Sequence, residues 1–259
     1  MGVVNVTPDS FSDGGRFLEP AAAIDHAHQL LAEGADLLDL GAESSRPGAA
    51  AEVSAEEELR RLLPVLRALR DLPVPLSVDT IKPEVMRVAL AEGASMVNDI
   101  NALRVPGALA AVAASDAGVC LMHMQGTPGT MQQHPGYGDV VAEVRDFLAE
   151  RIEAARAAGI ALERISIDPG FGFGKTLEHN LELLRHLREF SALGVPVLAG
   201  WSRKSALGRI TGRPAGDRVA ASIAAALIAA QNGAGILRVH DVAATRDALS
   251  VLAAVEKTQ

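Results

Sequence analysis

Short apolar runs alternate with longer segments of helical spacing along the whole chain. The runs are typical of strands buried in a parallel sheet and lie at residues 3–6, 36–40, 75–78, 95–98, 118–122, 164–167, 196–199 and 235–239. The longer segments repeat apolar residues every three or four positions, as amphipathic helices do, and include 21–32, 55–70, 83–91, 140–158, 180–190 and 243–255. The pattern predicts eight strands with helices between them.

A glycine near the end of several of these helices marks the passage into the next strand. Gly34, Gly93 and Gly233 occupy this position, and glycine accepts the left-handed conformation that stops a helix. No linker, low-complexity tract or charge block divides the chain, which predicts one domain over residues 1–259. Eight strand–helix units closed in parallel form a TIM (β/α)8 barrel of the α/β class. A doubly wound open sheet is the alternative, because periodicity does not show closure.

Composition narrows the classes of protein. The net charge of −8 argues against nonspecific binding to nucleic acid or to anionic membranes. The longest apolar stretch, 219–230, is shorter than the roughly 20 residues that span a bilayer. It predicts a buried helix, in the core or in a dimer seam. Cys120 is the single cysteine and lies in an apolar run, so we expect a buried core residue. No signal peptide is visible, and we expect a cytoplasmic protein.

Polar residues follow the predicted strands one after another. The strand ends lead into Asn5, the run 41–48, Asp79, Asn98, His123, the run 168–175, the run 202–205, and Arg238 with His240. A single polar strand end is usually a turn or a helix cap. In a TIM barrel, however, all strands end at the same rim, where the active site is built. The sequence therefore predicts one polar site at this rim.

Four of these runs, residues 5–15, 43–48, 168–175 and 202–205, resemble the motifs of dihydropteroate synthases almost letter for letter. The resemblance covers essentially the whole chain. It implies a TIM barrel with a pterin pocket in its mouth. It also implies a transferase of folate biosynthesis, which condenses (7,8-dihydropterin-6-yl)methyl diphosphate with 4-aminobenzoate and gives 7,8-dihydropteroate and pyrophosphate. Mg²⁺ assistance, a homodimer and competition by sulfonamides are further implications.

Three features depart from the family pattern. Members usually carry a hairpin before the first strand, whereas this sequence begins inside that strand, so either the native chain starts upstream of Met1 or the barrel lacks the hairpin. Ser45 stands where many members have threonine, which keeps the hydroxyl. Trp201 stands where methionine is common and is expected to fill the core behind Lys204. None of these departures removes a candidate catalytic group.

A pterin ring presents a ring N–H beside an exocyclic amino group, and a carboxylate matches this edge with two parallel hydrogen bonds. Asp168 is the candidate, with Asn98 serving neighbouring ring positions; both residues could instead be turn residues. Asp79 could stabilise positive charge on the ring, and the resemblance implies that it contacts the pterin. Met122 and Phe173 complete the pterin candidates, although Phe173 could equally fill the core.

Departure of pyrophosphate leaves a pterin cation that the arylamine attacks, so the site needs positive groups around the leaving group. The candidates for binding the diphosphate are Asn5, Ser45, Arg46, Arg238 and His240. Arg238 and His240 alternate along the last strand, which predicts that they share one face. Mg²⁺ prefers oxygen ligands, and its candidates are Asn5 and, as a further choice, Asp13. The histidines are scattered, which argues against a histidine metal site.

Lys204 follows the seventh strand directly, where its ammonium could reach the pterin and the reacting centre. Together with Asp79 and Asp168 it forms the predicted catalytic set. The candidates for binding 4-aminobenzoate are Phe11, Pro47, Arg203, Lys204 and Ser205. The resemblance suggests that Phe11 and Pro47 wall the ring, while the helix that Ser205 opens suits the carboxylate. Arg203 could alternatively pair with a nearby acid.

Two other enzymatic or binding roles compete with this hypothesis. The pterin-binding domain of corrinoid methyltransferases shares the Asp and Asn pterin contacts but has no use for a diphosphate clamp. A catalytically silent paralogue would bind pterin or folate without turnover. The run from Gly170 to Thr176 superficially resembles a nucleotide-binding loop, but the required first glycine is Pro169. Nucleotide binding is therefore not predicted.

Overall fold

The computed structural model describes residues 1–6, 20–43 and 53–257. Within them, parallel strands pair in chain order: β1 (Gly2–Asn5), β2 (Leu38–Gly41), β3 (Leu76–Asp79), β4 (Met96–Asp99), β5 (Gly118–Met122), β6 (Ile165–Asp168), β7 (Val197–Ala199) and β8 (Ala234–Leu237). The last strand returns to the first, because Val3 N donates to Val239 O at 3.1 Å and Val239 N donates to Met1 O at 3.0 Å. This closure confirms the (β/α)8 barrel and removes the open-sheet alternative.

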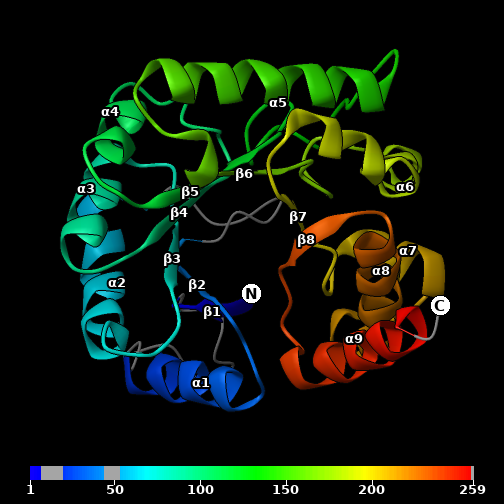
Figure 1. The fold of residues 1–259 in the computed structure, drawn as a ribbon, viewed down its shortest axis with the longest axis horizontal. Coiled ribbons are helices and arrows are strands. Elements are labelled where there is room, and N and C mark those ends of the chain that lie inside the picture. Colours follow the sequence, from blue (N-terminus) through cyan, green and yellow to red (C-terminus); the bar gives the residue numbers. More distant parts are fainter. Residues whose placement is uncertain (7–19, 44–52, 258–259) are drawn as a thin grey trace.

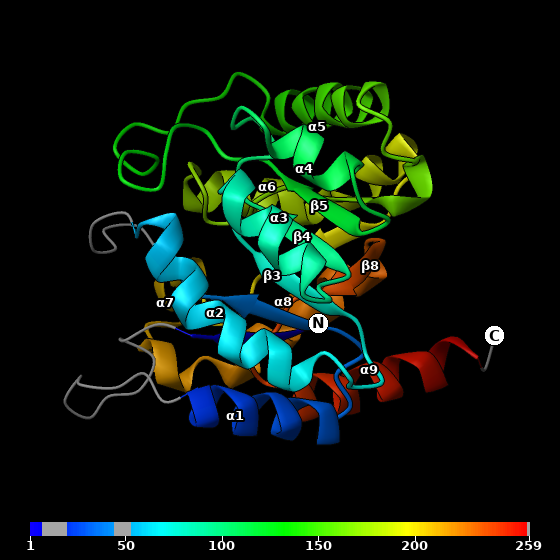
Figure 2. The same cartoon turned by 90° about the vertical axis from the view of Figure 1, so that its left-hand side faces the viewer.

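Helices surround the strands in chain order (Figure 1). They are α1 (Pro20–Ala32), α2 (Ala55–Leu69), α3 (Pro83–Ala91), α4 (Ala108–Ala113), α5 (Val140–Ala157), α6 (Leu177–Arg185), α7 (Ser205–Thr211), α8 (Val219–Gln231) and α9 (Val242–Glu256). The side view shows the segment between β5 and α5, drawn in green, projecting beyond the strands (Figure 2). Loops at the carboxyl ends of barrel strands have room to form a site.

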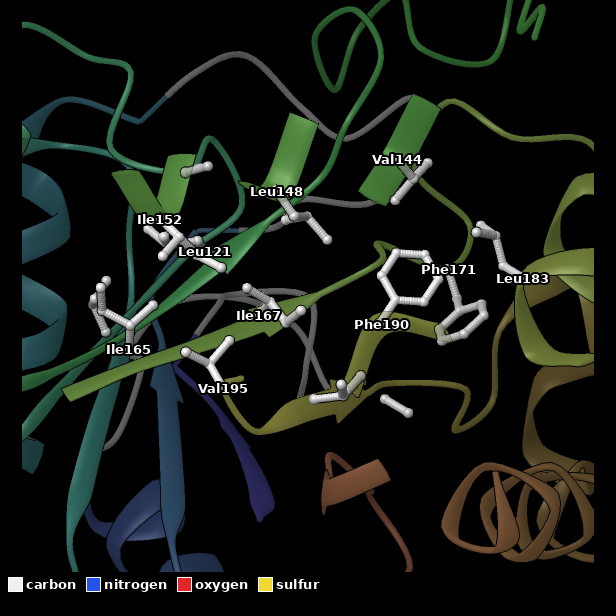
Figure 3. Close-up of a cluster of buried hydrophobic side chains, with 14 of the residues drawn as sticks. Leu121, Val144, Leu148, Ile152, Ile165, Ile167, Phe171, Leu183, Phe190 and Val195 are labelled. Carbon is white, nitrogen blue, oxygen red and sulfur yellow. The ribbon is translucent and has the colours of Figure 1, made fainter. Parts of the chain in front are cut away.

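Period-2 alternation sends one set of strand side chains outward to the helices. Leu121 of β5 and Ile167 of β6 are fully buried and face Leu148 and Ile152 of α5 (Figure 3). Across the barrel, Leu38 and Leu40 of β2 pack in a second outer core with residues of α1 and α2. The apolar layer between strands and helices is thus where most of the fold's hydrophobic stabilisation lies.

The alternate residues of the same strands point into the barrel. Near the amino ends this interior is apolar, with Met1, Cys120 and Leu198 buried together. The prediction of a buried Cys120 is confirmed. Towards the carboxyl ends the interior turns polar, so the barrel has an apolar floor and a polar mouth.

Helix α8 is buried on one side only. Ser222, Ala225, Ala226 and Ala229 are buried, whereas Ile228 is 45% exposed. The stretch 219–230 is therefore a covering helix of the barrel and not a fully buried one. Among the described residues, no helix has the length and apolar character to cross a membrane.

The predicted strand positions lie within two residues of the observed ones, but one predicted helix was wrong at its end and one observed helix was not predicted. The predicted helix 180–190 ends at Arg185, and a 3-10 helix, Leu187–Leu193, follows it. Leu187 and Phe190 are both fully buried. Their spacing of three residues matches the three-residue turn of a 3-10 helix. Helix α4 was not predicted, because its small apolar residues show no polar face.

Candidate functional site

The polar mouth of the barrel brings most of the predicted site residues to one rim. Strand ends and the residues just after them carry the candidates Asn5 (β1), Asp79 (β3), Asn98 (β4), Met122 (β5), Asp168 (β6), Lys204 (after β7) and Arg238 (after β8). They are separated by up to 233 residues in sequence, between Asn5 and Arg238. The fold joins them because parallel strands of a closed barrel all end on the same side.

Asp168 is held by a tight turn. Its Oδ1 accepts a hydrogen bond from the N–H of Gly170 at 2.7 Å, and the side chain is almost fully buried. Gly170 has φ +74, and a Cβ there would lie 1.9 Å from the carbonyl oxygen of His123. Only glycine fits this turn. Burial raises the pKa of Asp168, while the charge of Lys204 opposes the rise. The turn therefore presents a desolvated carboxylate at the rim.

Lys204 lies between the β6 and β8 sides of the mouth. Its Nζ donates to the carbonyl oxygen of Phe171 and lies 4.9 Å from the centre of the Phe173 ring. Burial lowers the pKa of Lys204 to about 8, although the carboxylate of Asp168 favours the charged form. Trp201 is buried and packs on Phe171 at a ring distance of 4.9 Å, which confirms its predicted place in the core behind Lys204. The ammonium is thus close to its deprotonation point near neutral pH.

Arg238 binds two carboxylates across the barrel interior. Its Nε donates to Oδ2 of Asp39 at 2.6 Å, and its guanidinium also donates to Oδ2 of Asp79 at 3.0 Å. Burial raises the pKa of Asp79 to about 7, with Arg238 opposing this rise and Asp39 adding to it. Burial alone would lower the pKa of Arg238, but the two carboxylates raise it above its ordinary value. Asp79 is therefore poised between charged and neutral forms.

An apolar surface adjoins these charges. Met122 is buried with Ile100, Met124 and Met131, and the half-buried Phe173 packs against this group. Phe173 thus contacts both the methionine cluster and the ammonium of Lys204. A flat aromatic ligand would find apolar side chains beside hydrogen-bonding groups here, which is the usual make-up of a small-molecule site.

Three further candidates lie on the β7 and β8 loops. His240 Nδ1 and its backbone N–H both bond Oγ of Ser202, at 3.0 and 3.1 Å. Arg203 forms an ion pair with Asp241, so the structure shows the acid partner that the sequence left open. Ser205 is the exposed first residue of α7. Phe11, Asp13, Ser45, Arg46 and Pro47 lie outside the described residues.

Sequence reasoning missed two buried charges beside the site. Asp39 lies in the middle of β2 between two apolar residues, and this polar position in a buried run was the available signal. Lys175 was noted as the last residue of the run 168–175 but was given no role. Its Nζ bonds His123 Nδ1 at 2.9 Å and the carbonyl oxygens of Gly170 and Phe173 at 3.0 Å each. Lys175 therefore holds together the loop that presents Asp168.

A third charge that sequence reasoning missed is Lys82, which is half-buried between β3 and α3. Its Nζ donates to Glu43 and, at 2.8 Å, to Glu58, which is 1% exposed. Glu43 Oε1 also accepts the N–H of Val53 at 2.9 Å. Glu43 and Val53 flank residues 44–52, so this bond joins the two ends of the segment. Lys82 thereby links Glu43, which follows β2, to Glu58 of α2.

We expect Lys82→Met to destabilise the fold by about 3–5 kcal/mol, because it leaves the buried carboxylate of Glu58 without its cation. Urea unfolding measures the loss. Arg87→Met, in helix α3 that begins directly after Lys82, is the matched control: Arg87 lies 3.9 Å from Glu84 with both side chains exposed. The control should lose less than about 1 kcal/mol. Equal losses for the two variants would contradict the buried-charge interpretation.

The described residues contain no group of three or more His, Cys, Asp or Glu side chains that could hold a metal ion. Asn5, half-buried at the end of β1, offers an amide oxygen at the rim. A cation that takes few protein ligands and completes its shell with water and phosphate oxygens suits such a donor.

Comparisons with known proteins agree with this architecture. A sequence model described as "Pterin binding enzyme" matches residues 1–240. The dihydropteroate synthase of Escherichia coli K12 is 51% identical over 255 residues, which are 98% of this chain and 90% of that protein. The structure of Xanthomonas albilineans dihydropteroate synthase with 4-aminobenzoic acid is 60% identical with a TM-score of 0.92, covering 98% and 92% of the two chains. The Yersinia pestis dihydropteroate synthase in a sulfonamide drug complex is 49% identical with a TM-score of 0.94, covering 99% and 93%.

Proposed function

Since the chain belongs to the pterin-binding enzymes and among them to the dihydropteroate synthases, we propose that its rim of charged strand ends condenses (7,8-dihydropterin-6-yl)methyl diphosphate with 4-aminobenzoate. One observation carries the proposal: the carboxylates of Asp79 and Asp168 lie at the same rim as the cations Lys204 and Arg238. The reaction develops positive charge on the pterin and negative charge on the leaving group. A site with both signs of charge suits it.

Asp168 and Asn98 bind the polar edge of the pterin in this proposal. The carboxylate accepts from the ring N–H and the exocyclic amino group, while the amide of Asn98 supplies a donor and an acceptor. Asp79 faces the ring and favours its positive charge. Met122 and Phe173 provide the apolar contact beside the ring. Burial of both carboxylates makes their hydrogen bonds stronger than they would be in water.

The bond between the pterin methylene and the diphosphate oxygen breaks first, and the pair of electrons leaves with pyrophosphate. The nitrogen of 4-aminobenzoate then attacks the methylene carbon and loses a proton. We assign Lys204 to holding the pterin and the reacting centre. Asn5, Ser45, Arg46, Arg238 and His240 bind the diphosphate. Arg238 is already bonded to Asp39 and Asp79. It therefore donates its remaining N–H groups to the diphosphate, or it exchanges one of the two carboxylates for a diphosphate oxygen.

Binding of 4-aminobenzoate is assigned to Phe11, Pro47, Arg203, Lys204 and Ser205. The Xanthomonas structure with 4-aminobenzoic acid and the Yersinia complex with a sulfonamide support the expectation that both ligand classes bind this chain. Sulfonamides would then compete with 4-aminobenzoate, since each presents an aromatic amine opposite an acidic group. Lys204 contacts both substrates in this assignment, which places it at the point where the new bond forms.

Mg²⁺ is the proposed cofactor. Asn5 and the diphosphate would hold it, with Asp13 as a further ligand; the oxygen of Asn5 fits its preference. Bound Mg²⁺ would neutralise charge on the departing pyrophosphate. We further propose that residues 1–259 act as one pterin-binding domain, that the enzyme is a cytoplasmic homodimer, and that it binds neither nucleic acid nor membranes.

Release of pyrophosphate tests the function. Purified protein with the pterin diphosphate, 4-aminobenzoate and Mg²⁺ should produce pyrophosphate and 7,8-dihydropteroate in equal amounts. A methyltransferase-type pterin domain or a silent paralogue would bind pterin, seen as a thermal shift, without releasing pyrophosphate dependent on 4-aminobenzoate. That outcome would refute the proposal.

The pH dependence of kcat/KM should be bell-shaped, with limbs near pH 7 and pH 8. Asp79, with its pKa raised to about 7, must be ionised to favour the pterin cation, so activity falls as pH drops below this value. Lys204, with its pKa lowered to about 8, must be protonated, so activity falls as pH rises above it. Lys204→Arg should move only the alkaline limb upward. The substrates ionise in the same way in assays of the wild type and of Lys204→Arg. An alkaline limb that stayed in place in the variant would therefore exclude Lys204 as its origin.

A further inference from the structure

Asp39 is a fully buried carboxylate inside the barrel to which the proposed reaction gives no task. It lies in the middle of β2, opposite Ser77 of β3. Its neighbours Leu38 and Leu40 point outward into the apolar core, so alternation turns Asp39 to the interior. Burying a carboxylate is costly unless it is paired. An apolar residue, such as Leu198 in the barrel floor, would fill the same interior at lower cost.

Two proposed substrate-binding side chains share a single oxygen of Asp39. Its Oδ2 accepts the Nε–H of Arg238 at 2.6 Å and the amide N–H of Asn98 at 3.1 Å. Arg238 follows β8 and Asn98 is the last residue but one of β4, so the carboxylate joins opposite sides of the barrel. The other oxygen, Oδ1, accepts no hydrogen bond from the described residues. The contacts thus concentrate on the two side chains that belong to the site.

Each contact fixes the orientation of its partner. A carboxylate accepts hydrogen bonds only, so Asn98 must turn its Nδ2 to Asp39 and its carbonyl oxygen elsewhere. The guanidinium of Arg238 is planar, and two of its nitrogens donate to Asp39 and Asp79, which fixes the orientation of that plane. Side chains held in this way lose less conformational entropy when a ligand binds.

We propose that Asp39 is a positioning residue for the pterin diphosphate, acting through Arg238 and Asn98. The proposal rests on the proposed function, which assigns Asn98 to the pterin and Arg238 to the diphosphate. Asp39 orients the amide of Asn98 toward the pterin and the guanidinium of Arg238 toward the diphosphate. It has no role in binding 4-aminobenzoate: of the candidates for that substrate, Arg203, Lys204 and Ser205 lie in the described part of the chain, and none of them hydrogen-bonds Asp39.

Asp39→Asn tests the proposal, because it removes the charge and keeps the shape. We expect KM for the pterin diphosphate to rise by roughly ten- to hundredfold, the range for losing hydrogen bonds between charged groups. KM for 4-aminobenzoate should stay within about twofold of the wild-type value, since a positioning effect on one substrate leaves the other unchanged. Ser77→Ala is the matched control: Ser77 is buried in the same interior layer, and its hydroxyl has no partner among the described residues. Its KM values should match those of the wild type.

A double-mutant cycle shows whether Asp39 acts through Arg238. In an Arg238→Met background, Asp39→Asn should raise KM for the pterin diphosphate much less than it does alone. Fully additive effects, equal rises of both KM values, or wild-type kinetics would each overturn the proposal. If thermal unfolding shows that Asp39→Asn does not fold, the smaller Asp39→Ser replaces it with the same expectation. Failure of the wild type to release pyrophosphate would instead refute the proposed function.

Discussion

Lys204→Ala is expected to lower kcat/KM for dihydropteroate formation by about 10³-fold while the protein keeps its fold. Removing a single preorganised donor from a desolvated site costs about 10²–10³-fold in rate, and Lys204 is proposed to serve both substrates. Its ammonium lies beside Phe173 and is electrostatically coupled to Asp168 and Asp79. Folding does not need the charge, because burial lowers the pKa of Lys204 and thus already disfavours its charged form.

Steady-state assays of pyrophosphate release measure this loss, and circular dichroism with thermal unfolding checks the fold. Lys257→Ala is the matched control, since Lys257 is an exposed lysine at the end of α9. It should retain wild-type kinetics. If Lys204→Ala kept kcat/KM within about tenfold of the wild type, a range too small for a lost donor at the reacting centre, Lys204 would be removed from the proposed catalytic set.

The positions of the strands could be predicted because each strand satisfies a local rule. Each is a short, mostly apolar run, as expected of strands covered on both faces in a parallel sheet, and β2 is buried along its whole length. The predicted helix 180–190 failed because local spacing does not show where a helix changes its turn. That change depends on how Leu187 and Phe190 pack into the core against residues of other helices and strands.

The rim residues could be predicted from strand ends, but their partners could not. Arg238 reaches Asp39 and Asp79, which lie 199 and 159 residues earlier in the chain. Only closure of the barrel brings the last strand near the second and third. Asp39 was overlooked for a related reason: reasoning from strand ends directs attention to loops, whereas this carboxylate acts from within a strand. Pairing across a barrel interior depends on its curvature, which periodicity does not contain.

Asp168→Asn is expected to weaken binding of the pterin diphosphate by about 10²-fold or more. The amide removes one of the two acceptors and places an N–H group against the donor edge of the pterin, so a charge-assisted pair becomes a mismatch. Calorimetric titration with the pterin diphosphate measures the dissociation constant directly. Ser166→Ala is the matched control, because Ser166 is buried two residues earlier in β6 and its hydroxyl bonds the carbonyl oxygen of Val119. Its affinity for the pterin should equal that of the wild type.

The stability of Asp168→Asn distinguishes a functional carboxylate from a structural one. Burial raises the pKa of Asp168 above its unfolded value. A group with a raised pKa stabilises the fold fully below the unfolded pKa, and this contribution is lost as pH rises through the folded pKa. At pH values where the carboxylate is ionised, its charge therefore costs stability, and Asp168→Asn should unfold at the same temperature as the wild type or higher. A clear fall in Tm with unchanged pterin affinity would show that Asp168 serves its turn with Gly170 and not the substrate.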